Sequence, residues 1–223
     1  MLLVLLVCPL GAPLDAEAAR RMAALRAGSA ARSQLTAALS QEPPPRAFDL
    51  AVLLAAEERP EEDAAGIAAA VGGTIDTLAE AASARVRLSA LLGGGEPSSP
   101  RSVATAVSTT LFGSRGGSAD EAGEAFFSGS SQPSYYDPRN SFLDEVLSRR
   151  VGIPITLSLV YSEVCERLGL PMVGLNAPAH LLVAPAERVL PFVVDPFEGG
   201  ACLDAPAAAA LIARNAGFSF DVR

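Results

Sequence analysis

Strand-like runs occur only in the last third of this 223-residue chain, and that uneven distribution constrains the fold more than any other feature. The runs are short, rich in Leu and Val, and bounded by Gly, Pro or Asp; they cover residues 172–175, 180–184 and 192–195. Up to about residue 130 the chain consists largely of residues with high helix propensity, chiefly Ala and Leu. We therefore predict an α+β fold, with a helical N-terminal layer followed by a helix and a small antiparallel sheet.

Prolines and glycines divide the helical part into segments. Six helices are expected there, over residues 15–41, 48–58, 61–71, 74–92, 103–112 and 119–127. Gly28 would interrupt the first helix, and Gly72 with Gly73 would separate the third from the fourth, because Gly weakens a helix interior. The composition of residues 93–100, 114–117 and 128–134 predicts loops.

A helix over about 155–168 is the best-marked element of the C-terminal part. Pro154 suits its first turn, where a missing N–H costs nothing, and Gly169 with the following proline ends it. A shorter helix over 142–150 precedes it, and Asn140 or Ser141 is expected to cap that helix.

The last two strand-like runs predict a hairpin. If its loop covers 186–189, the pairing is symmetric and places His180 directly opposite Asp195. Opposed residues of an antiparallel pair point to the same face, with Cβ atoms about 4.5–5.5 Å apart. A slip of one residue would turn the two side chains to opposite faces. We therefore predict a hydrogen bond between this imidazole and this carboxylate.

Residues that carry chemistry are scarce. The chain has one His, three Cys at positions 8, 165 and 202, and no Lys. No CxxC or HxxxH pair exists, so we expect no metal site and no cofactor; the absence of Lys excludes Schiff-base chemistry and a phosphate-binding P-loop lysine. A formal net charge of −8 disfavours nucleic acid and anionic membranes as partners. Widely separated Cys are expected to be reduced thiols, which favours an intracellular setting.

The chain begins with an apolar run, MLLVLLVCPL. It is far shorter than the roughly 20 residues of a spanning helix, so no integral membrane segment is expected. Two interpretations stay open. The run is either the core of a cleaved targeting segment, which needs about 7–15 apolar residues, or a plain N-terminal extension.

The segment YYDPRNSFLDEVLSRRVGIPITLSLVYSEVCERLGLPMVGLNAPAHLLV, followed by VVDPFEGG, resembles the SirB-type transglutaminase-like family. The similarity is strongest over 135–203 and extends weakly to FDLAVLLAAEERPEED at 48–63. The resemblance implies three parts: an N-terminal extension at 1–45, a helical part with loop insertions at 46–134, and a papain/transglutaminase-like core at 135–223. In that family a related domain precedes tetratricopeptide repeats in bacteria and also occurs in an animal F-box protein.

The resemblance also implies a thiol nucleophile at the start of the 155–168 helix, activated by the helix dipole and by a His that a carboxylate orients. This chain has Pro154 and further residues without sulfur there. Cys165 lies 11 residues beyond Pro154, roughly 16 Å along a helix, so it is expected to be a buried apolar residue. The strand motif departs from the family as well, since Ala179 precedes His180 where Gly is usual.

Three hypotheses about function follow. In the first, the chain is a non-catalytic module for protein interaction or regulation, and the His180–Asp195 pair stiffens the sheet. In the second, it is a cysteine-dependent hydrolase or acyltransferase, in which Cys202 acts with His180 and Asp195 as the candidate dyad. In the third, the chain is a fragment of a longer repeat-containing protein. A protein partner is expected, and the sequence leaves its identity and the oligomeric state open.

Overall fold

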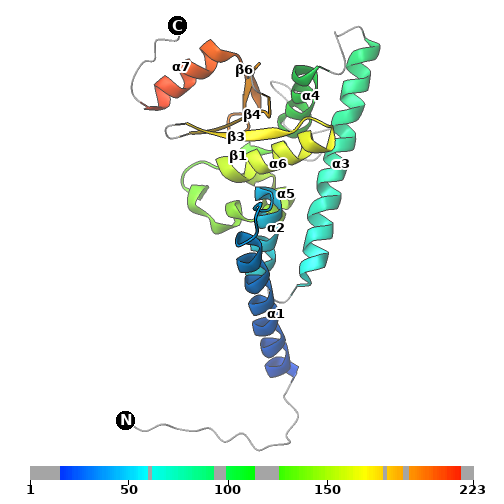
Figure 1. The fold of residues 1–223 in the computed structure, drawn as a ribbon, viewed down its shortest axis with the longest axis vertical. Helices are drawn as coiled ribbons and strands as arrows, with labels where there is room; N and C mark the ends of the chain where they lie inside the picture. Colours follow the sequence, from blue (N-terminus) through cyan, green and yellow to red (C-terminus); the bar gives the residue numbers. More distant parts are fainter. Residues whose placement is uncertain are drawn as a thin grey trace, which may run out of the picture.

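The computed structural model describes residues 16–59, 62–92, 99–113, 126–177, 180–187 and 191–216. Their fold is α+β, as predicted: helices make up the N-terminal part, and a small sheet lies beside the later of these helices in the upper half of the view in Figure 1. The apolar run at the N-terminus lies outside the described residues. Among the helices that are described, none is long and apolar enough to cross a membrane.

The N-terminal helices are fewer and longer than the sequence predicts; they are α1 (Ala16–Leu39), α2 (Ala47–Glu58), α3 (Ala64–Leu91) and α4 (Pro100–Phe112). Two expected breaks are wrong. Helix α1 continues through Gly28, and α3 continues through Gly72 and Gly73. In α3 the buried residues stay in phase across the two glycines, from Val71 to Ile75, so packing outweighs about 1 kcal/mol of helix propensity for each glycine.

The segment between α4 and Pro154 differs most from the prediction. Of the expected 119–127 helix, residues 119–125 lie outside the described part, and Phe126 and Phe127 are not helical. The expected loop at 128–134 begins with a short strand, β1 (Ser128–Gly129), which pairs in parallel with β2 (Val151–Gly152). Two 3₁₀ turns, η1 (Ser134–Tyr136) and η2 (Pro138–Ser141), lead into α5 (Leu143–Arg149). Neither Asn140 nor Ser141 caps α5, because both belong to η2 and Phe142 takes the N-cap position.

Helix α6 (Pro154–Arg167) begins at Pro154 and ends before Gly169, as expected. Glycine 169 has a φ of +76°, the left-handed conformation that ends a helix. An apolar stripe of this helix is buried at Leu157, Val160 and Val164. Helices α2, α3, α4 and α5 all pack against α6, which makes it the central helix of the fold.

The sheet has four antiparallel strands in the order β3 (Met172–Ala177), β4 (His180–Pro185), β5 (Val193–Asp195) and β6 (Ala201–Leu203). One face, with Val183 and Val194, belongs to the main core with α6. The opposite face, with Leu182 and Val193, packs against α7 (Ala205–Ala216), which lies across the upper end of the molecule. The sequence patterns predicted neither β6 nor α7.

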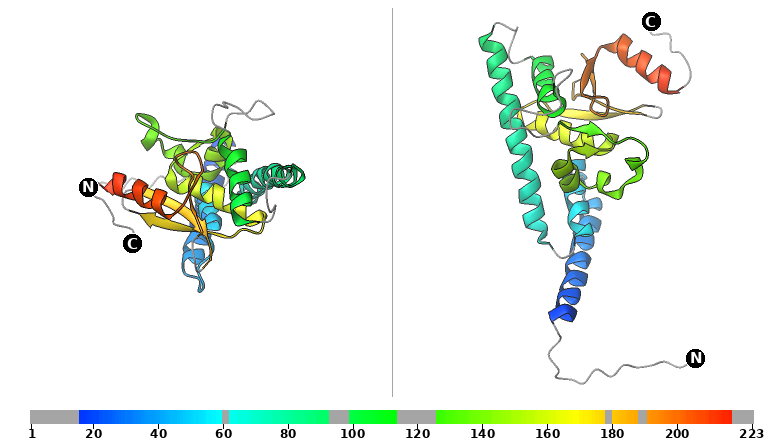
Figure 2. Two further views of the ribbon diagram at one scale, coloured as in Figure 1. Left: turned by 90° about the horizontal axis from the view of Figure 1, so that it is seen from above. Right: turned by 180° about the vertical axis from the view of Figure 1, so that it is seen from behind.

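Helix α3 runs beside the other elements over most of the height of the molecule, as the view from behind in Figure 2 shows. It contacts α2, α4, α5 and α6. Its buried stripe, from Ile67 to Ala82, belongs to the same core as Leu157 of α6 and Val194 of the sheet. The helical layer and the sheet therefore share one hydrophobic core.

Candidate functional site

His180 and Asp195 meet across β4 and β5, as predicted. His180 Nε2 lies 2.6 Å from Asp195 Oδ2. The predicted register is wrong by two residues, because Val194 rather than Phe192 lies opposite Val183. A shift of two keeps every side chain on its face, so the imidazole reaches the carboxylate as a diagonal neighbour instead of an opposed one. The two side chains are almost enclosed, at 8% and 2% exposed.

A tight turn after β5 holds the Asp195 carboxylate in place. Its Oδ1 accepts hydrogen bonds from the backbone N–H groups of Phe197 and Glu198, both at 3.1 Å. The N–H of Gly200 donates to the Asp195 carbonyl at 2.7 Å and closes the turn. Gly200 has a φ of +73°, and a Cβ there would lie 2.5 Å from the Phe112 ring, so this turn requires glycine.

The His180 ring lines a cavity of about 360 Å³ at the start of α6. The cavity is open to solvent and is lined by residues of η1, α6, the turn after β5 and α7, which are Tyr135, Pro154, Phe197, Glu198, Leu211, Arg214 and Asn215. The helix start and the imidazole therefore lie side by side, as the resemblance to transglutaminases implies. The residues at that helix start are Pro154, Ile155 and Thr156, and none of them supplies a thiol.

The structure keeps both described cysteines away from this cavity. Cys165 lies near the other end of α6, fully buried, and burial raises the pKa of its thiol. Cys202 pairs with Val194, so it points to the face of the sheet opposite Asp195. Its Sγ lies 4.0 Å from Thr105 Oγ1 of α4, and burial raises the pKa of this thiol too. The candidate nucleophile Cys202 is therefore not brought to the His180–Asp195 pair.

Metal binding has no support in the part of the chain that the structure describes. Within it, no three His, Cys, Asp or Glu side chains come together as ligands for an ion. His180 is the one imidazole of the chain, and its Nε2 is engaged by Asp195.

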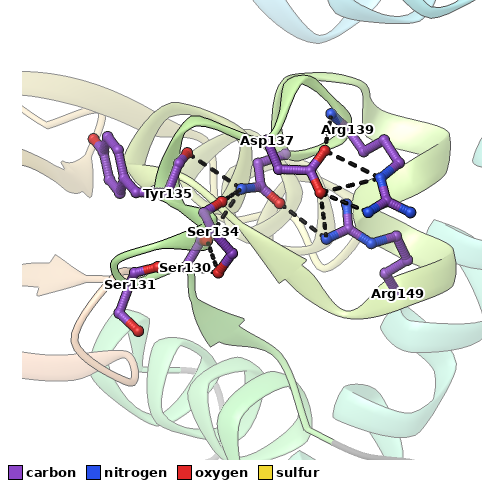
Figure 3. A network of polar contacts seen from close by, with 8 residues as sticks. Ser130, Ser131, Ser134, Tyr135, Asp137, Arg139 and Arg149 are labelled. Atoms are coloured by element: carbon purple, nitrogen blue, oxygen red, sulfur yellow. Dashed lines mark hydrogen bonds and ion pairs between the residues drawn. The ribbon is translucent and has the colours of Figure 1, made fainter.

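A polar network beside the cavity is a feature that the sequence analysis missed. Asn140, fully buried, donates from Nδ2 to Ser130 Oγ at 3.1 Å and to the Ser134 carbonyl at 2.8 Å. Its Oδ1 accepts from Arg149 Nη2 at 3.1 Å. Figure 3 shows how this network ties the segment at 130–137 to Arg149 at the end of α5. The cluster of turn-forming residues at 135–140 was the available signal, but it indicated turns and a cap rather than a buried amide.

Thr156 connects this network to the start of α6. Its hydroxyl donates to the Asn140 carbonyl at 2.9 Å and accepts the Ile153 N–H at 3.1 Å. Gly152 allows this approach, because a Cβ there would lie 2.8 Å from Thr156 Oγ1. The first turn of α6 is thus fixed by hydrogen bonds from outside the helix.

An electrostatic pair lies at the exposed end of the same network. Arg139 donates to both carboxylate oxygens of Asp137, with Nη2 2.6 Å from Oδ2. These hydrogen bonds lower the pKa of Asp137 from 3.8 to about 2. The carboxylate also accepts the Arg139 backbone N–H at 3.0 Å, which fixes the start of η2.

A central helix whose start faces a His–Asp pair on an adjoining antiparallel sheet defines a transglutaminase-like domain. The family model described as transglutaminase-like superfamily matches residues 69–223. The chain belongs to this superfamily.

Relatives match shorter parts of the chain. A UPF0162 protein of Xylella fastidiosa is 50% identical over 72 residues, which are 32% of this chain and 25% of that protein. A UPF0162 protein of Vibrio cholerae is 38% identical over 76 residues, 33% of this chain and 27% of the relative. Human F-box only protein 21 is 43% identical over 49 residues, 22% of this chain and 8% of that protein. The chain thus spans about a quarter of these UPF0162 relatives, and no solved structure matches it.

Proposed function

We propose that this chain is a non-catalytic transglutaminase-like domain that serves as a protein-interaction or regulatory module. One observation carries the proposal: the start of α6 beside His180 presents Pro154 and Ile155 where a thiol nucleophile would be needed. We further propose that the domain belongs to the SirB-type branch, because the match with that family's motifs runs through both α6 and the strand with His180.

The placement of His180 and Asp195 supports a structural role for the pair. Both are buried, and the carboxylate receives two backbone N–H groups besides the imidazole. Such a saturated carboxylate holds β4, β5 and the following turn together. A general base has to reach a nucleophile at about 3 Å, and no thiol of the described residues stands beside the ring.

The alternative, a cysteine-dependent hydrolase or acyltransferase using Cys202, has weaker support. The thiol points to the other face of the sheet, and its raised pKa leaves little thiolate at neutral pH. Iodoacetamide labelling of Cys202 should therefore be slow at pH 7 and should accelerate only above the ordinary thiol range. A reactive thiolate at pH 6 that depends on His180 would support the hydrolase instead.

Replacing His180 distinguishes the non-catalytic module from the cysteine-dependent enzyme. We expect His180→Ala to lower the free energy of unfolding by about 3 kcal/mol, because it leaves a buried carboxylate oxygen without its partner. The wild-type chain should release no ammonia from glutamine peptides and should hydrolyse no peptide amide above the buffer rate. Urea unfolding and ammonia release measure the two effects. Turnover by the wild type that a folded His180→Ala variant loses would contradict the proposal.

A further inference from the structure

The sheet ends in an open edge at β3. Strand β3 is the outer strand of the order β3-β4-β5-β6, and no strand of the described residues pairs with its other side. Val173 is 43% exposed, and Gly174 and Asn176 are exposed too. The strand contains neither a charged residue nor Pro, the devices that usually protect a sheet edge against a further strand.

A groove of about 370 Å³ runs along this edge. Met172 and Gly174 of β3 form one wall, and the start of α2 around Phe48 forms the other. The floor is a stripe of α6 at Ile155, Leu159, Ser162 and Glu166. Their spacing of four, three and four residues places them on one face of the helix. Leu181 and Val183 of β4 also line the groove, and on the side away from β4 no strand of the described residues covers Ile155, which is 59% exposed.

Ser158 supplies a buried hydroxyl without a hydrogen-bond partner at this groove. It lines the groove and is 95% buried, with 5% of its surface exposed. Its Oγ has no hydrogen-bond partner among the described residues. A buried hydroxyl without a partner is uncommon in a finished core and costs about 1–3 kcal/mol of desolvation.

The charges of the groove favour a basic occupant. Two acids line the groove, Glu163 and Glu166. Glu163 pairs with Arg46, which also lines the groove, at 3.0 Å and with Arg167 at 2.5 Å. Glu166 is exposed and pairs with no group of the described residues. The net charge of −8 adds a long-range attraction for a cationic segment.

We propose that the β3 edge and this groove bind an extended, basic peptide segment of a partner protein as a fifth strand of the sheet. Alternate apolar side chains of the segment cover Ile155 and Leu159, a polar group accepts from Ser158, and a Lys or Arg pairs with Glu166. Recognition combines main-chain hydrogen bonds to β3 with side-chain pockets. This inference rests on the proposed function in assigning the domain a protein partner.

The test uses the full 223-residue chain and a phage-displayed library of random twelve-residue peptides. Selected peptides are synthesised with a fluorescent label and titrated by anisotropy. We expect an enriched pattern of alternating apolar residues with Lys or Arg near one end. Only every second N–H of an added strand faces β3. N-methylation of the backbone at either the odd or the even positions of the peptide should therefore weaken binding, and N-methylation at the other set of positions should not.

Two variants locate the binding surface. Ile155→Glu should weaken peptide binding about tenfold or more by burying a charge under the peptide. Glu166→Arg should weaken basic peptides about fivefold. Neither change should harm folding, because Glu suits the first turn of a helix and Arg the last. The matched controls are Leu88→Glu, at a site 55% exposed on α3, and Glu80→Arg, also exposed on α3; both should bind as the wild type does.

Three results would overturn the inference. The library yields no peptide that prefers the wild type over Ile155→Glu, the peptides bind without dependence on the phase of methylation, or the wild type forms a dimer in sedimentation that Ile155→Glu breaks. The last result would assign the edge to a second copy of the chain. Turnover assays on the same samples test the proposed function separately from peptide binding. Turnover would contradict the proposed non-catalytic function and would not change the result of the peptide-binding measurements.

Discussion

Thr156 and Ser158 lie two residues apart near the start of α6, and both are buried, with 3% and 5% of their surface exposed. The Thr156 hydroxyl donates to the Asn140 carbonyl and accepts the Ile153 N–H, whereas the Ser158 hydroxyl has no partner among the described residues. The two side chains are thus about equally buried, but only the Thr156 hydroxyl forms hydrogen bonds. On the flank of α6 that faces Asn140 the Thr156 hydroxyl is fully hydrogen-bonded, and on the flank that faces β3 the Ser158 hydroxyl can still bind a ligand.

Asn140→Ala should have the largest effect, because it removes the centre of the polar network. The change leaves the Ser134 carbonyl and Arg149 Nη2 without their amide partner in a partly buried place. We expect the free energy of unfolding to fall by about 3 kcal/mol, as measured by urea denaturation. Asn176→Ala, on the exposed β3 edge, is the control and should change stability by less than about 0.5 kcal/mol. Equal effects of the two changes would remove the contrast between the flanks.

Thr156→Val tests the link between the network and α6. Valine keeps the shape but leaves the Asn140 carbonyl and the Ile153 N–H without the hydroxyl. A loss of about 1.5–2 kcal/mol is expected in thermal or urea unfolding. An unchanged stability would show that water takes the place of the hydroxyl, and that this flank of α6 is more accessible to solvent than its geometry indicates.

Ser158→Ala should act in the opposite direction. Removing a buried hydroxyl that has no partner should leave stability unchanged or raise it by up to about 1 kcal/mol. The same change should weaken the binding of selected peptides, because it removes a donor from the groove. A loss of stability as large as that of Thr156→Val would show that Ser158 already has a partner in solution and would make the two flanks alike.

The pH dependence at Asp137 is the smallest expected effect, because this carboxylate lies at the exposed end of the network. Its pKa is lowered to about 2 by Arg139, below the value near 3.9 of an unfolded chain. Its contribution to stability is therefore complete above about pH 4 and is lost as the pH falls from 4 to 2. Urea midpoints between pH 6 and pH 2 should depend less on pH in Asp137→Asn than in the wild type. Identical profiles would place the acid sensitivity elsewhere.

The sequence predicted those parts of the fold that depend on local chemistry or on strong periodicity. Pro154 and Gly169 mark the ends of α6, and the apolar stripe from Leu157 to Val164 fixes its buried face. The glycines at 72 and 73 misled the prediction, since what keeps α3 continuous is packing against elements distant in sequence. Helix propensity depends on a residue and its neighbours in the sequence, so it does not include packing against distant elements.

In the candidate site, too, the sequence predicted what depends on local pattern and missed what depends on contacts between distant segments. The assumed hairpin loop put His180 and Asp195 opposite each other and therefore on one face of the sheet. The shared face is confirmed although the register was off by two, because a shift by an even number of residues leaves each side chain on its face. The role of Asn140 could not be predicted in this way. Its partners come from the residue after β1, from η1 and from α5, and a sequence pattern does not predict which turns will pack around a single amide.

The 28 residues of α3 form a rod of roughly 42 Å. Because this rod is unbroken at its glycine pair and contacts α2 as well as α4, α5 and α6, these helices are expected to unfold together. Heat should therefore melt the main core in one step, with equal calorimetric and van't Hoff enthalpies. A strain applied near α2 would likewise reach α4 without a hinge to absorb it.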